Sequence, residues 1–172
     1  MRKLFCTGAL AALVIASAVN AEMKFGYINS EAIFAEYEGT KEAQNKFNKE
    51  VAVWEQEASK KQQEIKNLKE QIDKQSLLLS AERKKALEDS LNQKMVDYQK
   101  FLNDKFGKDG TALKKNEELT KPIIEKINRI IEKIAKEENY DYIFDARAGG
   151  IVYAKKVYDL NQRVLEALNK EN

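Results

Sequence analysis

The chain is poor in the residues on which most enzymes and disulfide-stabilised proteins depend. Its 172 residues contain no histidine, one cysteine (Cys6) and one proline (Pro122). Without histidine, and with its cysteine in the leading apolar run, the rest of the chain cannot form a His-based triad, a thiol nucleophile or an ordinary zinc site. No disulfide can form within one chain, so packing alone must hold the fold together. We therefore expect no enzyme activity, no cofactor and no metal.

The first 21 residues have the pattern of an export signal. A basic start at residues 1–3 precedes an apolar run over residues 4–19, which ends in small side chains. We expect cleavage near Ala21, which also removes Cys6. The alternative is an uncleaved membrane anchor, for which this apolar run lies at the short limit.

The positive charge of the whole chain comes from this leader. Arg2 and Lys3 are two of the 30 basic residues, and the leader has none of the 28 acidic ones, so the remaining chain carries 28 of each sign. A basic excess that would favour nucleic acid is therefore missing, and we expect no nucleic-acid partner. Charged residues make up 34% of the chain, a composition typical of an extended helical protein.

Residues 47–79 form the stretch around which the rest is organised. Alternating steps of four and three residues, starting at Phe47 and ending at Leu79, reach ten positions, of which eight are apolar. This is a heptad stripe on an uninterrupted helix, and such a stripe needs a partner helix to cover it. The residues after Ser80 supply that partner, with a stripe closer to an eleven-residue repeat: Leu87, Leu91, Met95, Tyr98, Leu102, Phe106 and Leu113.

The two helical stretches match in length about a turn at residues 76–81. Gly39 and Pro122, which favour helix ends, lie at similar distances on either side of it. We therefore predict an antiparallel helical hairpin over residues 41–121, an arm about 60 Å long at 1.5 Å per residue. Gly107 and Gly110 lie inside the returning helix and are either tolerated there or form a flexible point.

The two ends of the chain, residues 22–40 and 122–172, are predicted to form a small α+β body. Phe25 and Tyr27 share one face of a first strand, and residues 140–145 and 151–154 form a hairpin of two more strands around the turn at residues 147–150. A helix after Pro122 carries six isoleucines and is expected to pack on the sheet. Asn139 can end this helix in a left-handed conformation. A three-stranded patch is too small to cover its own aromatic face, so we expect strands from several copies to close a shared core. Its residues are Phe25, Tyr27, Tyr142, Phe144, Ile151 and Tyr153.

Several of these features occur together in one known family. They are the export signal, the opening Lys24-Phe25-Gly26-Tyr27-Ile28-Asn29-Ser30, the charged hairpin, Tyr142-Ile143-Phe144-Asp145, Gly150-Ile151-Val152-Tyr153-Ala154 and the closing helix. In this order they resemble the Skp/OmpH family of periplasmic chaperones across the mature chain. The resemblance implies a periplasmic homotrimer with a shared β-barrel body and three helical arms around a cavity. It further implies an ATP-independent holdase for unfolded outer-membrane proteins. Well-known members are strongly basic, whereas this mature chain is neutral.

The far part of the arm nevertheless carries a local positive charge. Between residues 60 and 85, four acidic side chains stand against eight basic ones: Lys60, Lys61, Lys66, Lys69, Lys74, Arg83, Lys84 and Lys85. This is either an ordinary solvated helix surface or a contact for anionic lipid, lipopolysaccharide or acidic client segments. Packing at the turn explains the leucines at the tip more often than binding does. Apolar residues off the stripe are nevertheless the candidates for client contact: Val53, Leu77, Leu78, Val96 and Phe101.

Two functions fit this pattern, a periplasmic holdase and an exported coiled-coil spacer or adaptor with one fixed partner. The aromatic strands favour the holdase, because a spacer does not need a barrel. Many clients bound through weak, dispersed contacts would leave no focused site in the sequence.

Overall fold

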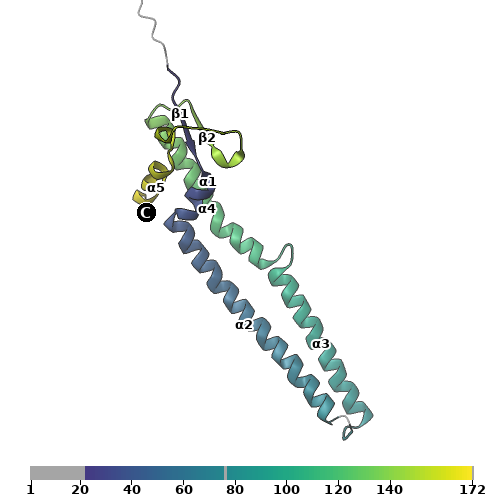
Figure 1. Cartoon of the computed structure of the whole chain (residues 1–172). Coiled ribbons are helices and arrows are strands. Elements are labelled where there is room, and N and C mark those ends of the chain that lie inside the picture. The colour runs from purple at the N-terminus through teal and green to yellow at the C-terminus, as the bar shows by residue number, and fades with distance from the viewer. Residues whose placement is uncertain (1–21, 76, 172) are drawn as a thin grey trace, which may run out of the picture.

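The computed structural model describes residues 22–75 and 77–171, so the predicted export signal, its cleavage site and Cys6 lie outside the described residues. A small body of short strands and helices carries a long arm of paired helices (Figure 1). The elements are β1 (Phe25–Ile28), α1 (Ser30–Glu36), α2 (Glu38–Gln75), α3 (Ala81–Phe106), α4 (Thr111–Glu137), β2 (Tyr142–Asp145), two short 3-10 turns, η1 (Ala146–Ala148) and η2 (Lys156–Tyr158), and α5 (Asn161–Lys170). No helix within the described residues has the length and apolarity needed to span a bilayer.

The sheet of the body has two strands that run parallel. β1 pairs with β2 in a register that sets Phe25 opposite Tyr142 and Tyr27 opposite Phe144. The other edge of β1 makes one bridge, between Tyr27 and Asp159. The predicted alternation of β1 is confirmed, because Phe25 is exposed on one face while Ile28 is buried on the other.

The predicted third strand at residues 151–154, and with it the hairpin, is wrong. The Asp145 carboxylate accepts hydrogen bonds from the Arg147 and Ser30 backbone amides, which turns the chain out of β2 into η1. Gly149 and Gly150 then take positive φ angles of 78° and 95°. Such angles suit glycine and lead the chain away from the sheet. Val152 and Tyr153 follow with exposed fractions of 100% and 83%.

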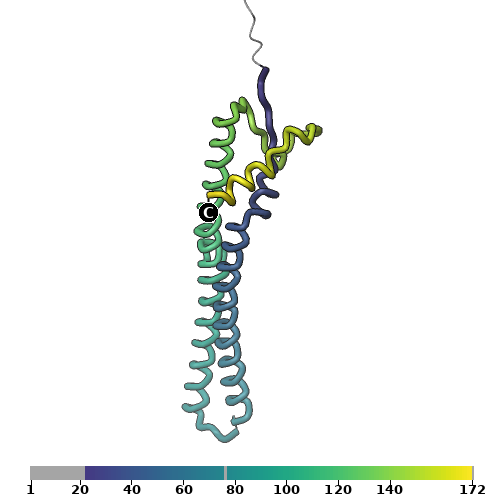
Figure 2. Tube along the Cα trace, turned by 90° about the vertical axis from the view of Figure 1, so that its left-hand side faces the viewer, coloured from purple at the N-terminus to yellow at the C-terminus, as the bar shows by residue number. Residues whose placement is uncertain are grey.

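The arm is built from α2 and the returning helices, which lie side by side and run in opposite directions (Figures 1 and 2). Ser80 begins α3 as predicted, with its hydroxyl accepting a hydrogen bond from the Arg83 amide. The half-buried residues of α3 recur with the seven-residue spacing of a heptad and not with the predicted eleven-residue spacing. Met95 and Phe106 are 48% and 42% exposed. Their places are taken by Lys94 and Lys105, whose aliphatic stems cover the seam while their charges reach solvent.

Pro122 does not end a helix, contrary to the prediction. α4 runs through it from Thr111 to Glu137 and carries the chain from the arm into the body. Proline in a helix costs about 3 kcal/mol, and packing on the body side offsets this cost. The returning helical segment is interrupted instead between Phe106, where α3 ends, and Thr111, where α4 begins, at the two glycines.

The core of the body forms between helices. Ile127, Ile130 and Ile134 of α4 pack with Ile33 of α1 and with the apolar face of α5, namely Val164, Leu165 and Leu168. The isoleucine stripe therefore packs mainly on helices, and the sheet that was predicted as its partner contributes Ile28 of β1 and Ile143 of β2 to the same cluster. Asn139 ends α4 with a φ of 55°, as predicted.

Candidate functional site

An aromatic hollow opens on the exposed face of the sheet. Its volume is about 650 Å³, and the loop that replaces the predicted third strand forms its far wall. The hollow gathers five of the six residues predicted to form a shared body: Phe25, Tyr27, Phe144, Ile151 and Tyr153. The sixth, Tyr142, stacks on Phe25 beside it.

Three rings form a compact cluster on this face. The centroid of the Phe25 ring lies 5.8 Å from that of Tyr142 and 6.3 Å from that of Phe144, and the Tyr142 centroid lies 6.0 Å from that of Phe144. All three rings stay 42–55% exposed. An exposed cluster of large apolar rings beside a hollow is the kind of surface that proteins cover with another chain.

Asp145 fixes the end of β2 against α1. Its carboxylate accepts hydrogen bonds from the Ser30 hydroxyl at 2.6 Å and from the Arg147 amide at 3.0 Å. Partial burial by itself raises the pKa of Asp145, but these hydrogen bonds outweigh it and hold the pKa below its ordinary value. At the other edge of the sheet, burial and then the charge of Asp159 raise the pKa of Tyr27.

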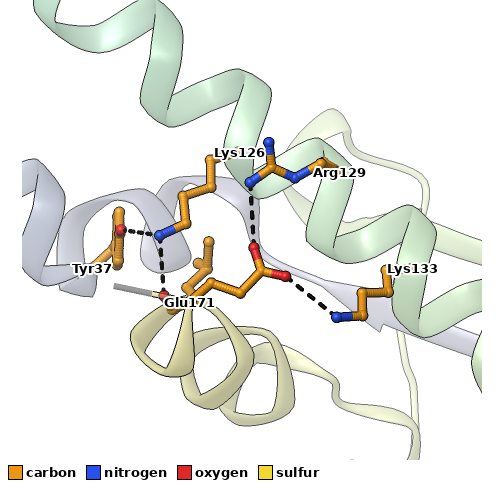
Figure 3. A network of polar contacts seen from close by, with 6 residues as sticks. Tyr37, Lys126, Arg129, Lys133 and Glu171 are labelled. Atoms are coloured by element: carbon orange, nitrogen blue, oxygen red, sulfur yellow. Dashed lines mark hydrogen bonds and ion pairs between the residues drawn. The ribbon is translucent and has the colours of Figure 1, made fainter.

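A polar network joins α4 to α5 and α1 where the arm enters the body (Figure 3). Lys126 Nζ donates to Tyr37 Oη at 2.9 Å and to the Leu168 carbonyl oxygen at 3.3 Å. Glu171 lies between Arg129 and Lys133, with a distance of 3.3 Å to each. These pairs link residues about 40 or 90 positions apart, and sequence periodicity gave no signal for them.

The candidate client-contact residues lie apart along the arm and do not form a single site. Leu77 and Leu78 are 97% and 87% exposed at the turn, and Val53 and Val96 are both 61% exposed. Phe101 lies on the half-buried heptad face of α3 and not off the stripe as predicted, with Lys61 Nζ 5.4 Å and Lys105 Nζ 5.9 Å from its ring centroid.

Trp54 marks the middle of the arm and was predicted as a seam residue. The Phe106 ring meets it edge-on at 6.2 Å, and Lys105 Nζ lies 5.2 Å from its centroid. Lysine over an aromatic face is attractive, most of all for tryptophan. Trp54 and Phe106 both belong to predicted stripes, but Lys105 was not part of the predicted stripe, so its place in this cluster was not predicted.

The basic residues of the far arm are only partly paired. Lys61, Lys74 and Lys84 lie within 4.0 Å of Glu57, Glu70 and Glu88. Two of these acids, Glu57 and Glu88, fall outside the 60–85 range and reduce its local charge. Within residues 22–75 and 77–171, the other five basic side chains form no ion pair: Lys60, Lys66, Lys69, Arg83 and Lys85.

The described residues include no group of three or more acidic side chains placed to hold a metal ion. The candidate surfaces for binding other molecules are the aromatic hollow and the two sides of the arm.

Three comparisons place the chain among known proteins. The family model described as "Outer membrane protein (OmpH-like)" matches residues 24–168. An uncharacterised protein of Aquifex aeolicus (strain VF5) is 25% identical over 99% of this chain and 98% of its own length. The crystal structure of an OmpH-like protein from Caulobacter crescentus CB15, assigned as an outer membrane chaperone, covers 98% of this chain and 92% of its own. Its TM-score is 0.79 at 12% identity, so it shows a shared fold. With the family match extending from β1 to α5, the chain belongs to the OmpH-like outer membrane protein family.

Proposed function

We propose that this chain is an ATP-independent periplasmic holdase, which binds unfolded outer-membrane proteins and keeps them soluble on their way to the outer membrane. The observation that carries the proposal is the extent of the family match, which includes the body and the whole arm. The assignment of the Caulobacter crescentus protein as an outer membrane chaperone supports the same function.

The arm has the surface that such an activity needs. Its exposed apolar side chains occur in ones and twos at several places along the arm, among them Val53 and the adjacent pair Met95 and Val96. Contacts of this kind are individually weak, so a client stays mobile and clients of unrelated sequence are accepted. A single deep pocket would instead select one partner.

The proposed holdase is a homotrimer joined at its body. The stacked rings of Phe25, Tyr142 and Phe144 and the hollow beside them are the apolar surface that the other copies cover. In the part of the chain that the structure describes, the outer edge of β2 has no strand partner. A free edge is a ready template for pairing with another chain. Three arms then extend from one body and surround the client.

A test of client breadth separates the holdase from a coiled-coil spacer. Several urea-unfolded outer-membrane proteins of unrelated sequence are diluted into buffer with and without the mature protein, and their turbidity is followed. The holdase suppresses the aggregation of all of them without nucleotide. A protein that protects none of them, or just one, is the spacer or adaptor.

We further propose that the end of the arm contacts an anionic surface, either phospholipid or lipopolysaccharide. Arg83 and Lys85 lie in the first turns of α3 beside the exposed Leu77 and Leu78. Basic side chains attract anionic headgroups, and exposed leucines add apolar contact. Flotation with anionic vesicles, neutral vesicles and lipopolysaccharide tests this. Arg83→Gln with Lys85→Gln should weaken the anionic binding, and equal binding to neutral vesicles would contradict it.

A further inference from the structure

The two sides of the arm use unequal numbers of residues at one place. From the Glu64–Lys94 ion pair to the Trp54–Phe106 contact, α2 runs back ten residues while α3 advances twelve. From Trp54–Phe106 to the Glu50–Lys115 ion pair, α2 runs back four residues while the returning chain advances nine. The returning side thus has two extra residues in the first interval and five in the second, so most of the excess lies between Phe106 and Lys115.

The four residues Gly107–Gly110 account for most of this excess. They lie between the end of α3 and the start of α4 and leave the line of the helices as a small loop (Figure 1). The loop is closed by the Gly107 amide on the Asn103 carbonyl and by the Gly110 amide on the Gly107 carbonyl, both at 2.9 Å. The Thr111 hydroxyl also donates to the Asp104 carbonyl at 3.1 Å. α2 passes the same point without interruption.

Contacts on both sides of the loop hold the helices to α2. On the tip side, the Phe106 ring packs edge-on against Trp54, and Lys105 lies over the same indole. On the body side, Lys115 Nζ lies 3.1 Å from Glu50 and 3.4 Å from Glu118. A change of length on the returning side is therefore confined to the loop between these contacts.

A loop on one side of a helix pair changes how the pair can bend. Two packed helices have axes 8–10 Å apart, so a bend of about 20° in their common plane changes their relative length by about 3 Å, the rise of about two helical residues. A long continuous helix such as α2 can curve gently without breaking. An unbroken returning helix would have to stretch its hydrogen bonds, whereas four loop residues can extend or close.

We propose that Gly107–Gly110 is an expansion joint that lets the arm bend and so determines which sizes of client the protein accepts. This inference rests on the proposed holdase function, since bending changes the space that the arms enclose. When the arm bends, the loop lengthens or shortens, and α2 remains a continuous helix. The body and the seam keep their structure while the arm opens or closes.

The joint is tested first without any client. The distance between spin labels at Lys85→Cys and Glu125→Cys measures the length of the returning side across the loop. The distance between labels at Glu42→Cys and Lys69→Cys measures the length of the continuous helix α2. All four side chains are exposed, and the labelled chains are diluted with unlabelled protein. We expect a broader distance distribution across the loop than along α2. Deleting residues 107–110 should narrow the first distribution to the width of the second. Distance distributions of equal width across the loop and along α2 in the unaltered protein would contradict the proposal.

A second variant covers the case in which the deletion does not fold. Inserting Gly-Ser between Asp109 and Gly110 lengthens the loop and should broaden the distribution across it. Lys108→Ala with Asp109→Ala changes the same exposed loop without altering its length, and should leave the width unchanged. An insertion variant as narrow as the unaltered protein would contradict the proposal.

Client size is measured separately, with unfolded outer-membrane proteins of eight and of sixteen or more strands. The deletion variant should bind the small clients within about twofold of the unaltered protein and lose at least about tenfold in affinity for the large ones. Equal losses for both, or none, would show that the joint does not determine client size. If the unaltered protein binds no client, the holdase proposal fails, while the distance measurements still decide whether the arm bends.

Discussion

The Phe25 and Tyr142 rings stack at 5.8 Å, although the two residues lie far apart in the sequence. The parallel pairing of β1 with β2 sets them opposite each other, and the Phe144 ring packs against both of them. Each ring remains about half exposed. This is the apolar surface of the body for which a single chain provides no cover among its described residues.

Replacing Tyr142 and Phe144 with serine should dissociate the protein into single chains. The aromatic cluster on the sheet loses two of its three rings, and with them most of the apolar area proposed to join the copies. The helices of the arm do not contact these rings, so the helical signal in circular dichroism should stay within about 10% of its original value. Light scattering gives the mass.

Val53→Ser is the matched control, because it removes an exposed apolar side chain from α2 and not from the body. It should leave the mass unchanged. A Tyr142→Ser, Phe144→Ser protein that kept its full assembly mass would show that another surface joins the copies.

Lys126→Met should destabilise the junction between the arm and the body. Lys126 donates to the hydroxyl of buried Tyr37 and to the Leu168 carbonyl, and its loss leaves these groups without that donor. We expect a loss of about 1–3 kcal/mol in the free energy of unfolding, measured with urea. Lys121→Met, at an exposed position on the same helix, should change it by less than about 0.5 kcal/mol. Similar losses in the two variants would remove the special role of Lys126.

Alanine at Gly107 and Gly110 should disrupt the break between α3 and α4. A Cβ atom at Gly107 would lie 2.4 Å from the Asn103 carbonyl oxygen, and one at Gly110 would lie 2.7 Å from the Lys105 carbonyl oxygen. Because these neighbours are backbone atoms, the loop must move, at a cost of about 1–3 kcal/mol in urea unfolding. Lys108→Ala with Asp109→Ala is the control, and an equally small effect of both pairs would show that the loop adapts freely.

The contribution of Asp145 to stability should disappear in acid. Hydrogen bonds from Ser30 and Arg147 outweigh burial and lower its pKa in the folded state. Its stabilising effect is therefore fully present above the unfolded-state pKa of about 4 and is lost as the pH falls through the lower folded value. Asp145→Asn should lower the unfolding free energy by about 1–3 kcal/mol at pH 7 and by much less near pH 2. A difference that stayed constant between these pH values would contradict this role.

Local signals in the sequence predicted many local features of the fold. The alternation of β1, the Ser80 cap and the left-handed Asn139 follow from side chains acting on their own backbone, which is why they could be predicted. The identity of the family followed from the order of such features.

Features that depend on distant contacts were not predicted. Pro122 was read as a helix end, but the packing of Ile127 and Ile130 keeps α4 continuous through it. Ile151–Ala154 has the composition of a strand, yet composition does not specify a partner, and the segment leaves the sheet after two glycines with positive φ. Lys94 and Lys105 were left out of the predicted stripe, because a periodicity analysis does not count the apolar part of a lysine side chain.

The most direct test of the proposed function is the mass of the mature protein in solution, measured by light scattering alone and with an unfolded outer-membrane protein. We predict a mass of three chains, which shifts to a soluble complex of one trimer and one client. A monomer or dimer that forms no complex with any client would contradict the holdase proposal.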